Sequence, residues 1–566
     1  MVSERTATAV RNGGVAILDT LRAWGVDRVF ICPGSTEAPF LDASLSYPDI
    51  ELVTTSHEAI TVSMADGYAR MTGRPSVAYV HTHLGLANGL ASLCGAQLGR
   101  SPVVVVTGLK ATSLHGVATG FTTTSDVREL PRQFVKWAHE TASAEAIATD
   151  LDHALRVAAT APAGPVFLGV AQDRLEADAP DARARARPEV ALGRVRPARE
   201  AVVAAADVMA GCARPLVVAG AEVFRAGGEA VASLQALADA LAAPLVVEDR
   251  RTIERAEPAG LSGYAGMLDA GSDIVRDSDL VILAGARTPI RFEHTSPPVI
   301  PAGRIVVHVG EDADDLLRGP AVLPLLGDVG PTLADLAAAL DARDGRRSRD
   351  DGYRERAVAM HRAHVAELRR EADERAGASP ISVPALMRRL CALLPDDTWI
   401  VDDGVTSRAA LLGHALAHDA GLRYLATASG SLGWGVGAAL GVAEARPGRR
   451  VVAVSGDGAF QFGLPGLWTA VDRRLPVTFL VVNNQGYGAV KAALRRFGGT
   501  AVASGRYPAS TLADVDLAAV ARGFGASGWR IDRLDELDDV FARAQRAPGP
   551  AVVEVLTDPD DSGPVR

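Results

Sequence analysis

Short hydrophobic runs alternate with longer amphipathic stretches along almost the whole chain. Each run holds four to six residues rich in Val, Ile, Leu or Phe, which is too short for a buried helix and predicts a strand. Strands that are hydrophobic on both faces need cover on both sides, and helical patterns separate these strands, so the pattern predicts parallel sheets flanked by helices. The predicted strands are Arg28–Cys32, Glu51–Thr54, Ser76–His81, Pro102–Thr107, Pro165–Val170, Pro215–Ala219, Pro244–Val247, Leu280–Ala284, Arg304–Val309, Thr398–Asp402, Arg450–Ser455, Val477–Val482 and Ala551–Leu556.

Two polar segments divide this pattern into blocks. The first reads DAPDARARARPEVALGRVRPARE, has no hydrophobic period and is typical of an exposed linker. The second leads into a charged amphipathic helix, Ala357–Ala376. We therefore expect an α/β protein of three doubly wound parallel-sheet domains at residues 1–180, 200–342 and 379–566. The linkers are expected at 181–199 and, with the charged helix, at 343–378.

The composition narrows the class of protein. The chain is 48% hydrophobic and 22% charged, a globular balance that argues against disorder and coiled coil. A formal net charge of −10 argues against nucleic acid as a partner. The four cysteines lie far apart, which argues against a disulfide framework and fits a reducing compartment. Because the N-terminus lacks a signal-peptide pattern and no hydrophobic run approaches ~18 residues, we expect a cytoplasmic protein without membrane contact.

The densest chemistry lies at the ends of two neighbouring predicted strands. One strand runs into Gly456-Asp457-Gly458, and the next runs into Asn483-Asn484 followed by Gln-Gly-Tyr-Gly. In a parallel sheet both sequences emerge at the carboxyl edge, where ligands of open α/β folds bind. A carboxylate with neutral oxygens suits Mg²⁺, and glycines allow phosphate to approach the backbone amides. The spacing therefore predicts a site for Mg²⁺ and phosphate.

A GDG sequence followed one helix later by NN resembles the diphosphate-binding motif of thiamine-diphosphate-dependent enzymes. The resemblance implies that Asp457, the Asn484 side chain and the Gly486 carbonyl hold Mg²⁺ against the cofactor's diphosphate. It implies a phosphate-facing helix beginning at Ala459 and Phe460. By the same resemblance Leu432 would wedge the cofactor into its bent form, and the Gly430 carbonyl would accept from its 4′-amino group. The remaining residues implied in cofactor binding are Gly456, Gly458, Ala459, Tyr487 and Thr406.

Thiamine chemistry also needs a carboxylic acid at the far end of the cofactor. His57-Glu58, followed by A-DGYAR, closely resembles the catalytic-glutamate segment of the family, which assigns this acid to Glu58. A glutamate in a mostly apolar pocket suits the task, because burial favours its protonated form. The alternative is structural, since a carboxylate at a helix N-terminus also complements the helix dipole. In this family the cofactor bridges subunits, so the resemblance implies a homodimer or homotetramer with the active site at the interface.

Within the family the first domain resembles benzoylformate decarboxylases, through CPGSTEAPF, YVHTHLGLAN, FVKW and AGPVFL. Carried over by position, Ser35 would bind the substrate carboxylate and His81 would relay protons near neutral pH. His83 lies two residues further in a segment expected to be extended, so it would point to the same side and compete with His81. His294 is the nearest match to the second active-site histidine of these decarboxylases, although its register differs by a residue or more.

Two positions depart from these decarboxylases. Ala426 and Ala493 stand where aromatic side chains hold a phenyl ring, and Lys491 lies close by in the sequence. These departures favour a larger, more polar or charged 2-oxo acid, or a larger acceptor, over benzoylformate.

The resemblance as a whole implies a thiamine-diphosphate- and Mg²⁺-dependent decarboxylation of a 2-oxo acid through an enamine, which is released as an aldehyde or passed to a carbonyl acceptor. An acetolactate-synthase-like carboligase is the alternative in the same class. Its flavin site would be sought near Val218–Gly220 and Gly285–Arg287, but FAD is not expected.

Two alternatives come from other classes. A nicotinamide dehydrogenase would use Gly435-Val436-Gly437, although the spacing GxGxxxG departs from the dinucleotide fingerprint and leaves Asn484 unexplained. A non-catalytic nucleotide-binding regulator is disfavoured because Glu58, Asp457 and Asn484 are all present.

Overall fold

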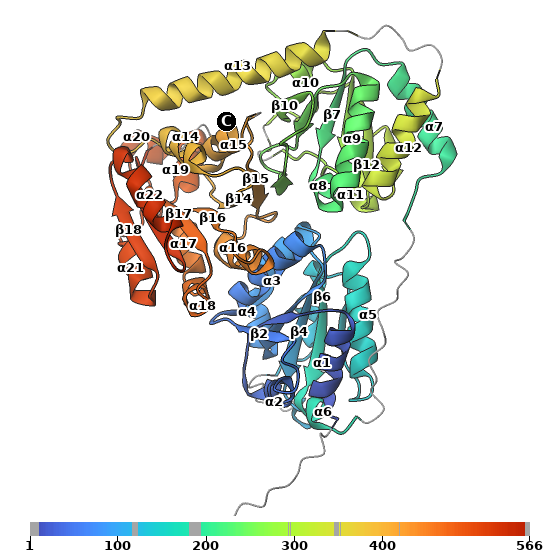
Figure 1. The fold of residues 1–566 in the computed structure, drawn as a ribbon, viewed down its shortest axis with the longest axis vertical. Helices are drawn as coiled ribbons and strands as arrows, with labels where there is room; N and C mark the ends of the chain where they lie inside the picture. Colours follow the sequence, from blue (N-terminus) through green and yellow to red (C-terminus); the bar gives the residue numbers. More distant parts are fainter. Residues whose placement is uncertain are drawn as a thin grey trace, which may run out of the picture. The chain divides into compact units, whose positions relative to one another are not determined.

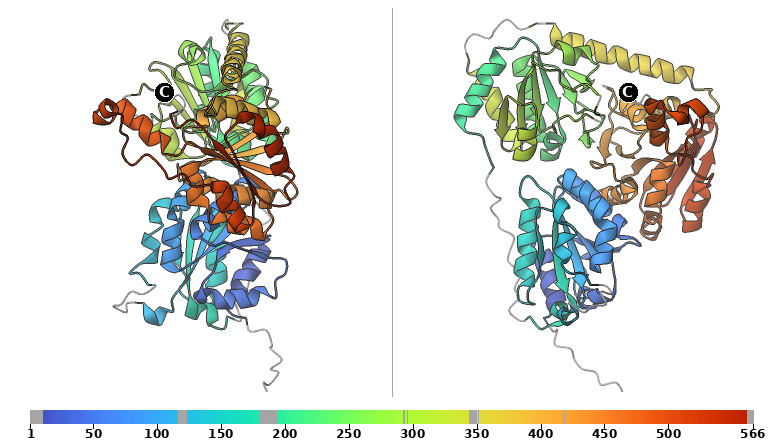
Figure 2. Two further views of the ribbon diagram at one scale, coloured as in Figure 1. Left: turned by 90° about the vertical axis from the view of Figure 1, so that its left-hand side faces the viewer. Right: turned by 180° about the vertical axis from the view of Figure 1, so that it is seen from behind.

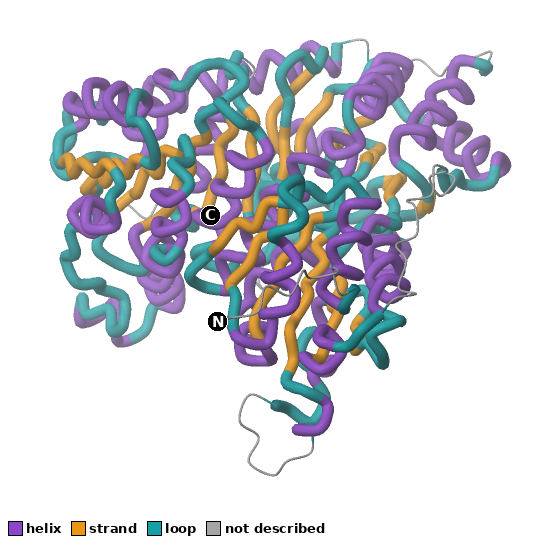
Figure 3. Tube along the Cα trace, turned by 60° about the horizontal axis from the view of Figure 1, so that its bottom comes forward, coloured by secondary structure: helices purple, strands orange, loops and turns teal. Residues whose placement is uncertain are grey.

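A computed structural model of the protein describes residues 11–115, 123–179, 194–291, 294, 296–343, 350, 352–417 and 419–560. Its strands form three sheets flanked by helices (Figures 1 and 3). By its internal contacts the chain divides into two compact units. The first comprises the described parts of Met1–Leu192 with Ser429–Arg449 and Gln461–Val477, and the second comprises those of Gly193–Ala428, Arg450–Phe460 and Thr478–Arg566.

The first unit contains one six-stranded sheet in which every ladder is parallel. In sheet order its strands are β2 (Glu51–Thr54), β1 (Arg28–Cys32), β3 (Ser76–His81), β4 (Val103–Leu109), β6 (Val166–Ala171) and β5 (Ala138–Glu140). Its helices are α1 (Gly13–Ala23), α2 (Ala38–Ser44), α3 (Glu58–Thr72), α4 (Thr82–Leu98), α5 (Ile147–Ala159), α6 (Gln172–Glu176), α16 (Trp434–Ala445) and α18 (Gly466–Asp472).

Helices cover both faces of this first sheet (Figure 2). On one face, Leu21 of α1 and Leu151 of α5 share a buried cluster with Val29. The neighbouring residue Phe30 points to the opposite face, because side chains alternate along a strand. There its ring packs edge-on against Tyr68 of α3, with the ring centroids 5.6 Å apart.

The second unit contains two sheets, and the first of these, the central sheet, has only parallel ladders. In sheet order its strands are β10 (Tyr264–Met267), β8 (Leu245–Val247), β7 (Pro215–Ala219), β11 (Leu280–Ala284), β12 (Ile305–Gly310) and β13 (Leu323–Leu326). The third sheet of the chain runs β18 (Ser527–Ile531), β19 (Ala551–Leu556), β17 (Val477–Asn483), β16 (Val451–Gly456), β14 (Trp399–Asp403), β15 (Arg423–Ala426) and β9 (Arg255–Ala256). The last strand, β9, pairs antiparallel with β15.

Helices flank both of these sheets. Those of the second unit are α7 (Arg199–Ala210), α8 (Ala221–Ala226), α9 (Gly228–Leu241), α10 (Asp273–Asp277), α11 (Ala313–Arg318), α12 (Val329–Asp341), α13 (Tyr353–Glu374), α14 (Val383–Leu393), α15 (Arg408–Ala415), α19 (Gly488–Phe497), α20 (Thr500–Ser504), α21 (Leu517–Phe524) and α22 (Leu537–Gln545). Helix α17 (Asp457–Gly463) continues from the second unit into the first.

The first and third sheets share one topology. When the strands of each sheet are numbered in chain order and β9 is left out, the first and third sheets both have the strand order 2-1-3-4-6-5. The central sheet has the order 3-2-1-4-5-6. In such sheets the ligand crevice opens where the strand order reverses, outside the carboxyl ends of the strands. The crevices of the first and third sheets are therefore expected at β1/β3 and at β14/β16, where the residues singled out in the sequence lie.

The predicted fold class is confirmed, and each predicted strand is present to within one or two residues at its ends. Among the described residues, the strands that the hydrophobic pattern missed are β5, β9, β10, β13, β15 and β18. The phosphate-facing helix begins at Asp457, two residues before the predicted start. Residues 181–193 of the first predicted linker and 344–349 of the second lie outside the described residues. No helix of the described chain is long and apolar enough to cross a membrane.

Candidate active site

Three neighbouring strands of the third sheet bring together most of the predicted cofactor residues of the second unit. Thr406 follows β14, Asp457 follows β16 and Asn484 follows β17. The β14 loop is fixed at Asp402, whose carboxylate accepts from the Gly404 N–H at 2.8 Å. The edge of the sheet at the reversal of strand order thus carries a hydroxyl, a carboxylate and a carboxamide.

Asp457 and Asn484 converge on a single backbone amide. The Gly486 N–H donates to Asp457 Oδ2 at 3.1 Å and to Asn484 Oδ1 at 3.3 Å, while the Gly458 N–H donates to Asp457 Oδ1 at 2.9 Å. Burial raises the pKa of the Asp457 carboxyl to about 6, against the lowering effect of these backbone donors. A buried carboxylate beside a carboxamide oxygen is an arrangement that a cation would stabilise.

Glycines shape the space around this pair. A Cβ at Gly458 would lie 2.9 Å from the Tyr487 ring, and a Cβ at Gly488 would lie 3.0 Å from Asn484 Nδ2 and 3.1 Å from Thr406 Cγ2. A Cβ at Gly456 would meet no atom within 4 Å. Gly458 and Gly488 are therefore required by packing, whereas Gly456 borders open space that phosphate oxygens could enter.

The two adjacent asparagines have different roles. Asn483 Nδ2 donates to Glu554 Oε1 at 2.6 Å, and Asn483 Oδ1 accepts from the Gln485 N–H at 2.9 Å. Glu554 is fully buried on β19 and accepts in turn from the Ala518 N–H at 3.0 Å. Asn483 therefore fixes the loop from its inner side and leaves Asn484 to face Asp457.

The donor set fits a hard cation with few protein ligands. The described residues contain no cluster of three or more His, Cys, Asp or Glu side chains that could hold a metal. A cation beside Asp457 would therefore have one carboxylate and neutral oxygens, which suits Mg²⁺ with phosphate and water as its other ligands.

In the first unit Glu58 begins α3 and is half-buried. Asn88 Nδ2 donates to Glu58 Oε2 at 3.0 Å, and the Cys32 thiol is hydrogen-bonded to the same carboxyl. A Cβ at Gly85 would lie 2.9 Å from Glu58 Oε1. Burial, together with the charges of Glu58 and Glu37, raises the pKa of the Cys32 thiol to about 11. The pocket of Glu58 is thus more polar than the mostly apolar one that we expected.

The first sheet also brings the PGSTE loop against His81. Ser35 is exposed in a single 3-10 turn, Ser35–Glu37, that follows β1, and His81 ends β3. His81 Nδ1 lies 3.1 Å from Glu37 Oε2 and 3.1 Å from Thr36 Oγ1. The loop and the histidine predicted to contact substrate therefore lie together, at the expected crevice.

The structure changes the expected surroundings of His83 and does not test the prediction for His294. Helix α4 begins at Thr82, which has a positive φ of 51°, so His83 is a helical residue and the segment is not extended. The expectation that His83 points to the same side as His81 required an extended segment and therefore loses its basis. His294 lies in an exposed turn whose neighbours 292, 293 and 295 lie outside the described residues.

The glycine before α16 and the glycines within it have different surroundings. Gly430 has a positive φ of 72° and is exposed, and Leu432 beside it is half-buried. Gly435 and Gly437 lie inside α16, where a Cβ at Gly437 would approach Ser63 Oγ to 1.9 Å. Gly437 therefore allows close packing of α16 on α3. Because Gly435 and Gly437 both lie inside a helix and not in a strand-to-helix turn, the structural basis of the dehydrogenase alternative is removed.

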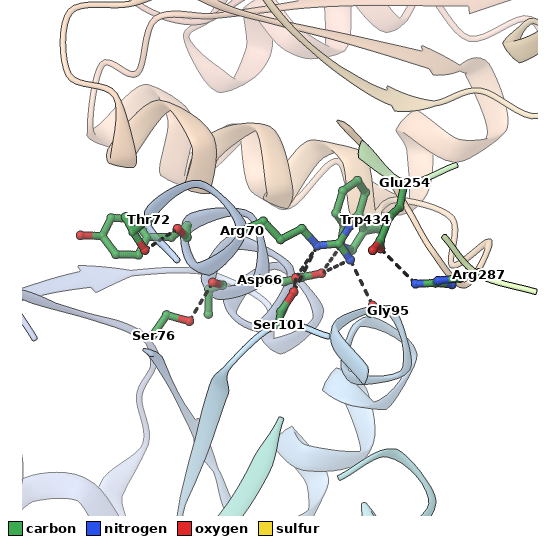
Figure 4. A network of polar contacts seen from close by, with 11 residues as sticks. Asp66, Arg70, Thr72, Ser76, Gly95, Ser101, Glu254, Arg287 and Trp434 are labelled. Atoms are coloured by element: carbon green, nitrogen blue, oxygen red, sulfur yellow. Dashed lines mark hydrogen bonds and ion pairs between the residues drawn. The ribbon is translucent and has the colours of Figure 1, made fainter. Parts of the chain in front are cut away.

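A buried polar network holds α3 against α16 (Figure 4). Asp66 accepts from Arg70 Nε at 2.8 Å, from Trp434 Nε1 at 2.7 Å and from the Ser101 hydroxyl. Arg70 Nη2 also donates to the Gly95 carbonyl at 3.1 Å. Asp66 and Arg70 of the DGYAR sequence are therefore structural residues that fix the helix whose first residue is Glu58.

A carboxylate of the central sheet binds loop amides at the reversal of its strand order. Glu248, which follows β8, accepts from the Ala221 N–H at 3.2 Å and from the Arg287 N–H at 2.7 Å. These amides follow β7 and β11, the strands between which the order reverses. A Cβ at Gly220 would lie 2.1 Å from Ala286 Cα, so the two loops touch. The amides that would bind a dinucleotide's phosphates are therefore already used.

Three protein-family models match the chain in succession. They are the N-terminal TPP binding domain of thiamine pyrophosphate enzymes at residues 11–130, the central domain at 202–336 and the C-terminal TPP binding domain at 408–555. Together they span most of the sequence. The chain belongs to the thiamine pyrophosphate enzyme family.

Relatives of this thiamine diphosphate enzyme are known in several bacteria. It is 29% identical to benzoylformate decarboxylase of Pseudomonas aeruginosa, over 96% of this chain and 98% of that protein. It is 27% identical to the large subunit of acetolactate synthase isozyme 2 of Escherichia coli, over 97% and 96% of the two chains. A solved structure of the thiamine diphosphate-dependent 4-hydroxybenzoylformate decarboxylase of Rhodococcus jostii RHA1 superposes with a TM-score of 0.82 at 26% identity, over 97% and 100% of the chains.

The protein is thus a thiamine-diphosphate-dependent decarboxylase or carboligase. Three residues of this enzyme that sequence reasoning did not single out lie at its predicted site, namely Cys32, Glu37 and Asn88. All three stand inside the segments that resemble benzoylformate decarboxylases. The signal that could have found Glu37 is a carboxylate in a loop otherwise made of small and apolar residues.

Proposed function

We propose that the protein catalyses the Mg²⁺-dependent, non-oxidative decarboxylation of a 2-oxo acid, releasing an aldehyde or passing the remaining fragment to a carbonyl acceptor. The convergence of Asp457 and Asn484 on the Gly486 amide carries this proposal, because it is the donor set that a Mg²⁺-diphosphate needs. When bound, thiamine diphosphate supplies an electron sink for the electron pair left by the departing CO₂.

At the diphosphate end, Asp457, the Asn484 side chain and the Gly486 carbonyl would hold Mg²⁺. The open space at Gly456 and the hydroxyl of Thr406 would receive phosphate oxygens. Gly458, Ala459 and Tyr487 would form the wall of this pocket, since Gly458 packs directly against the Tyr487 ring.

At the pyrimidine end, the Glu58 carboxyl would hydrogen-bond a ring nitrogen of the cofactor. Its other partners, Asn88 and Cys32, orient the carboxyl from within the same unit. Leu432 and the Gly430 carbonyl would contact the cofactor between its two rings. Gly430 supports this assignment, because its positive φ and exposure leave the backbone accessible.

The substrate would lie against the loop after β1. The exposed Ser35 hydroxyl would bind the substrate carboxylate. His81 would transfer the proton that is needed for release of the aldehyde. Ala426 is buried at the end of β15 and Ala493 is exposed on α19, so neither supplies the aromatic wall of a benzoylformate pocket. We therefore propose a larger, more polar or charged 2-oxo acid as substrate.

The test is to incubate the protein with thiamine diphosphate, Mg²⁺ and a panel of aromatic, aliphatic, acidic and basic 2-oxo acids. Released CO₂ reports decarboxylation, and product analysis separates aldehyde from acyloin. Glu58→Gln should lose turnover at least about 100-fold, because acid–base groups contribute 10²–10⁴-fold. Glu129→Gln, at an exposed ion pair of the same unit, is the matched control and should keep wild-type rates. Wild-type turnover in Glu58→Gln, or no CO₂ from any acid, would overturn the proposal.

A carboligase is the second candidate, favoured by the similarity to an acetolactate synthase subunit. In that case the acyloin would be the main product when a second carbonyl compound is present. We propose that either reaction proceeds without flavin, because Glu248 uses the amides of Ala221 and Arg287. A flavin absorbance band that co-purifies with the protein in stoichiometric amount would contradict this.

We further propose a homodimer or homotetramer with the active site at the subunit interface, as the family resemblance implies. Phe462 and Trp468, in the segment that contains α17 and α18, have 61% and 41% of their surface exposed. Exposed Trp and Phe side chains are enriched at protein–protein interfaces relative to the rest of the surface. Light scattering should give two or four times the chain mass of 58.9 kDa, and a monomer at micromolar concentration would refute the assembly.

A further inference from the structure

The side chain of Glu37 is buried completely beside His81, at the crevice of the first sheet. Its two carboxylate oxygens lie 3.2 Å and 3.1 Å from His81 Nδ1. The Gly34 N–H donates to Glu37 Oε2 at 2.7 Å, and the Thr36 hydroxyl donates to Glu37 Oε1 at 2.6 Å. The carboxylate is thus held by three donors from its own loop and from β3.

These contacts determine which nitrogen of His81 carries the proton. The Thr36 hydroxyl gives its hydrogen to Glu37, so its oxygen, 3.1 Å from His81 Nδ1, can only accept there. The Glu37 oxygens also accept. Every oxygen near Nδ1 in these contacts is an acceptor, so Nδ1 bears the hydrogen and Nε2 is the nitrogen available to another molecule. The His81 side chain keeps 27% of its surface exposed, which leaves a path to Nε2.

Two glycines allow the backbone to pack closely against His81 and Glu37. A Cβ at Gly34 would lie 2.2 Å from His81 Nδ1, and a Cβ at Gly108 would lie 2.0 Å from Glu37 Oε1. Gly108 pairs with His81 across β3 and β4. Any side chain at either position would displace the imidazole or the carboxylate, so the backbone itself is shaped to fit this pair.

We propose that Glu37 is the positioning residue of His81 in the decarboxylation. It holds Nδ1–H toward the interior and leaves Nε2 to exchange a proton with the substrate. When Nε2 takes up a proton, the buried carboxylate offsets the new positive charge, as in other carboxylate–histidine pairs of enzymes. This inference rests on the proposed function, in which His81 moves the substrate proton.

Other titratable groups near the pair stay protonated over the working range. The Cys32 thiol on β1 and the Tyr79 hydroxyl on β3 both sense the charge of Glu37. Burial raises the pKa of Cys32 to about 11 and that of Tyr79 well above its ordinary value, with the charge of Glu37 adding to both.

The experiment uses the thiamine-diphosphate- and Mg²⁺-loaded enzyme with its best 2-oxo acid. Glu37→Gln keeps the shape but removes the charge, and it should lower kcat by about 10–100-fold while KM changes by less than about threefold. The alkaline limb of the kcat profile should move to lower pH by about one unit, because the charge that favours a protonated imidazole is gone. Added formate should restore part of the rate of Glu37→Ala and none of that of His81→Ala.

A double variant and a matched control complete the design. If Glu37 acts through His81, Glu37→Gln should cause no further loss in a His81→Ala background. Glu248→Gln replaces another buried glutamate that accepts from two backbone donors, at the central sheet, and it should leave the pH profile unchanged.

The possible failures are distinguishable. A Glu37→Gln enzyme with wild-type kcat and pH profile, or one whose loss multiplies with that of His81→Ala, would overturn the inference alone. Wild-type turnover in His81→Ala would instead refute the role of His81 in the proposed function.

Discussion

Removing Asp66 should destabilise the first unit strongly, although Asp66 lies two helical turns from Glu58. Its carboxylate is fully buried and accepts from Arg70 Nε at 2.8 Å, Arg70 Nη2 at 3.1 Å and Trp434 Nε1 at 2.7 Å. Breaking a buried ion pair by removing one partner costs about 3–5 kcal/mol, because the remaining charge stays buried without its counterion. The hydrogen bond from the Trp434 indole involves the same carboxylate, so its loss is not added as a separate contribution. We therefore expect Asp66→Ala to lower the free energy of unfolding by about 3–5 kcal/mol in total.

The assay is urea unfolding followed by circular dichroism for a series of three variants. Trp434→Phe keeps the ring but removes its N–H, and it should lose about 1–3 kcal/mol. Asp126→Ala removes a carboxylate of the same type from an exposed pair with Arg128 and should lose about 0–1 kcal/mol. If Asp66→Ala loses no more unfolding free energy than Asp126→Ala, then burial does not determine the strength of this network, and the prediction is refuted.

Three further predictions concern packing, pH and the cofactor loop. Gly441→Ala should lower the free energy of unfolding by about 1–3 kcal/mol, since its Cβ would approach the Met64 carbonyl oxygen to 2.0 Å. Gly523→Ala would meet no atom within 4 Å and should raise the free energy of unfolding by about 0.4–1 kcal/mol. Equal thermal midpoints for the two variants would contradict this. Burial lowers the pKa of His414 to about 4, so between pH 6.5 and 4 the unfolded chain binds a proton that the folded chain does not. As the pH falls through this window, the free energy of unfolding of the wild type should decrease by about 3 kcal/mol relative to that of His414→Leu. Parallel curves of unfolding free energy against pH for the two proteins would refute this. Asn483→Ala should weaken thiamine diphosphate binding at saturating Mg²⁺ about tenfold in a fluorescence titration, because the loop loses its anchor on β19; unchanged affinity would show that the anchor is dispensable.

The sequence predicted the interior of each sheet better than its margins. Strands buried on both faces appear as continuous hydrophobic runs, which is why all those that line the site were found. Of the missed strands, all but β15 lie at the outer edge of a sheet. The β18 sequence SGWRI is mostly half-buried, and β9 is only two residues long. Such edges carry too few hydrophobic residues for a pattern to detect.

For the candidate site, the sequence located residues that follow strands and missed those defined by contacts across the fold. Asp457 and Asn484 were predictable because parallel strands end at one edge. Glu37 is a local signal only as a lone carboxylate in its loop, and nothing in the sequence indicates its contact with His81, which is 44 residues away. The segment from His81 to His83 was expected to be extended, but the chain passes from strand into helix at Thr82, which has a positive φ.

The two-residue strand β9 has a consequence for attempts to dissect the protein. It comes from the segment that also forms the central sheet, yet it covers the open side of β15 through pairs at Ala256 with Tyr424 and Arg255 with Leu425. A fragment that begins after the central sheet would leave β15 with unpaired N–H and C=O groups along one side, which is a template for intermolecular strand pairing. We expect such a fragment to aggregate, and supplying the missing strand as a fused peptide should restore solubility.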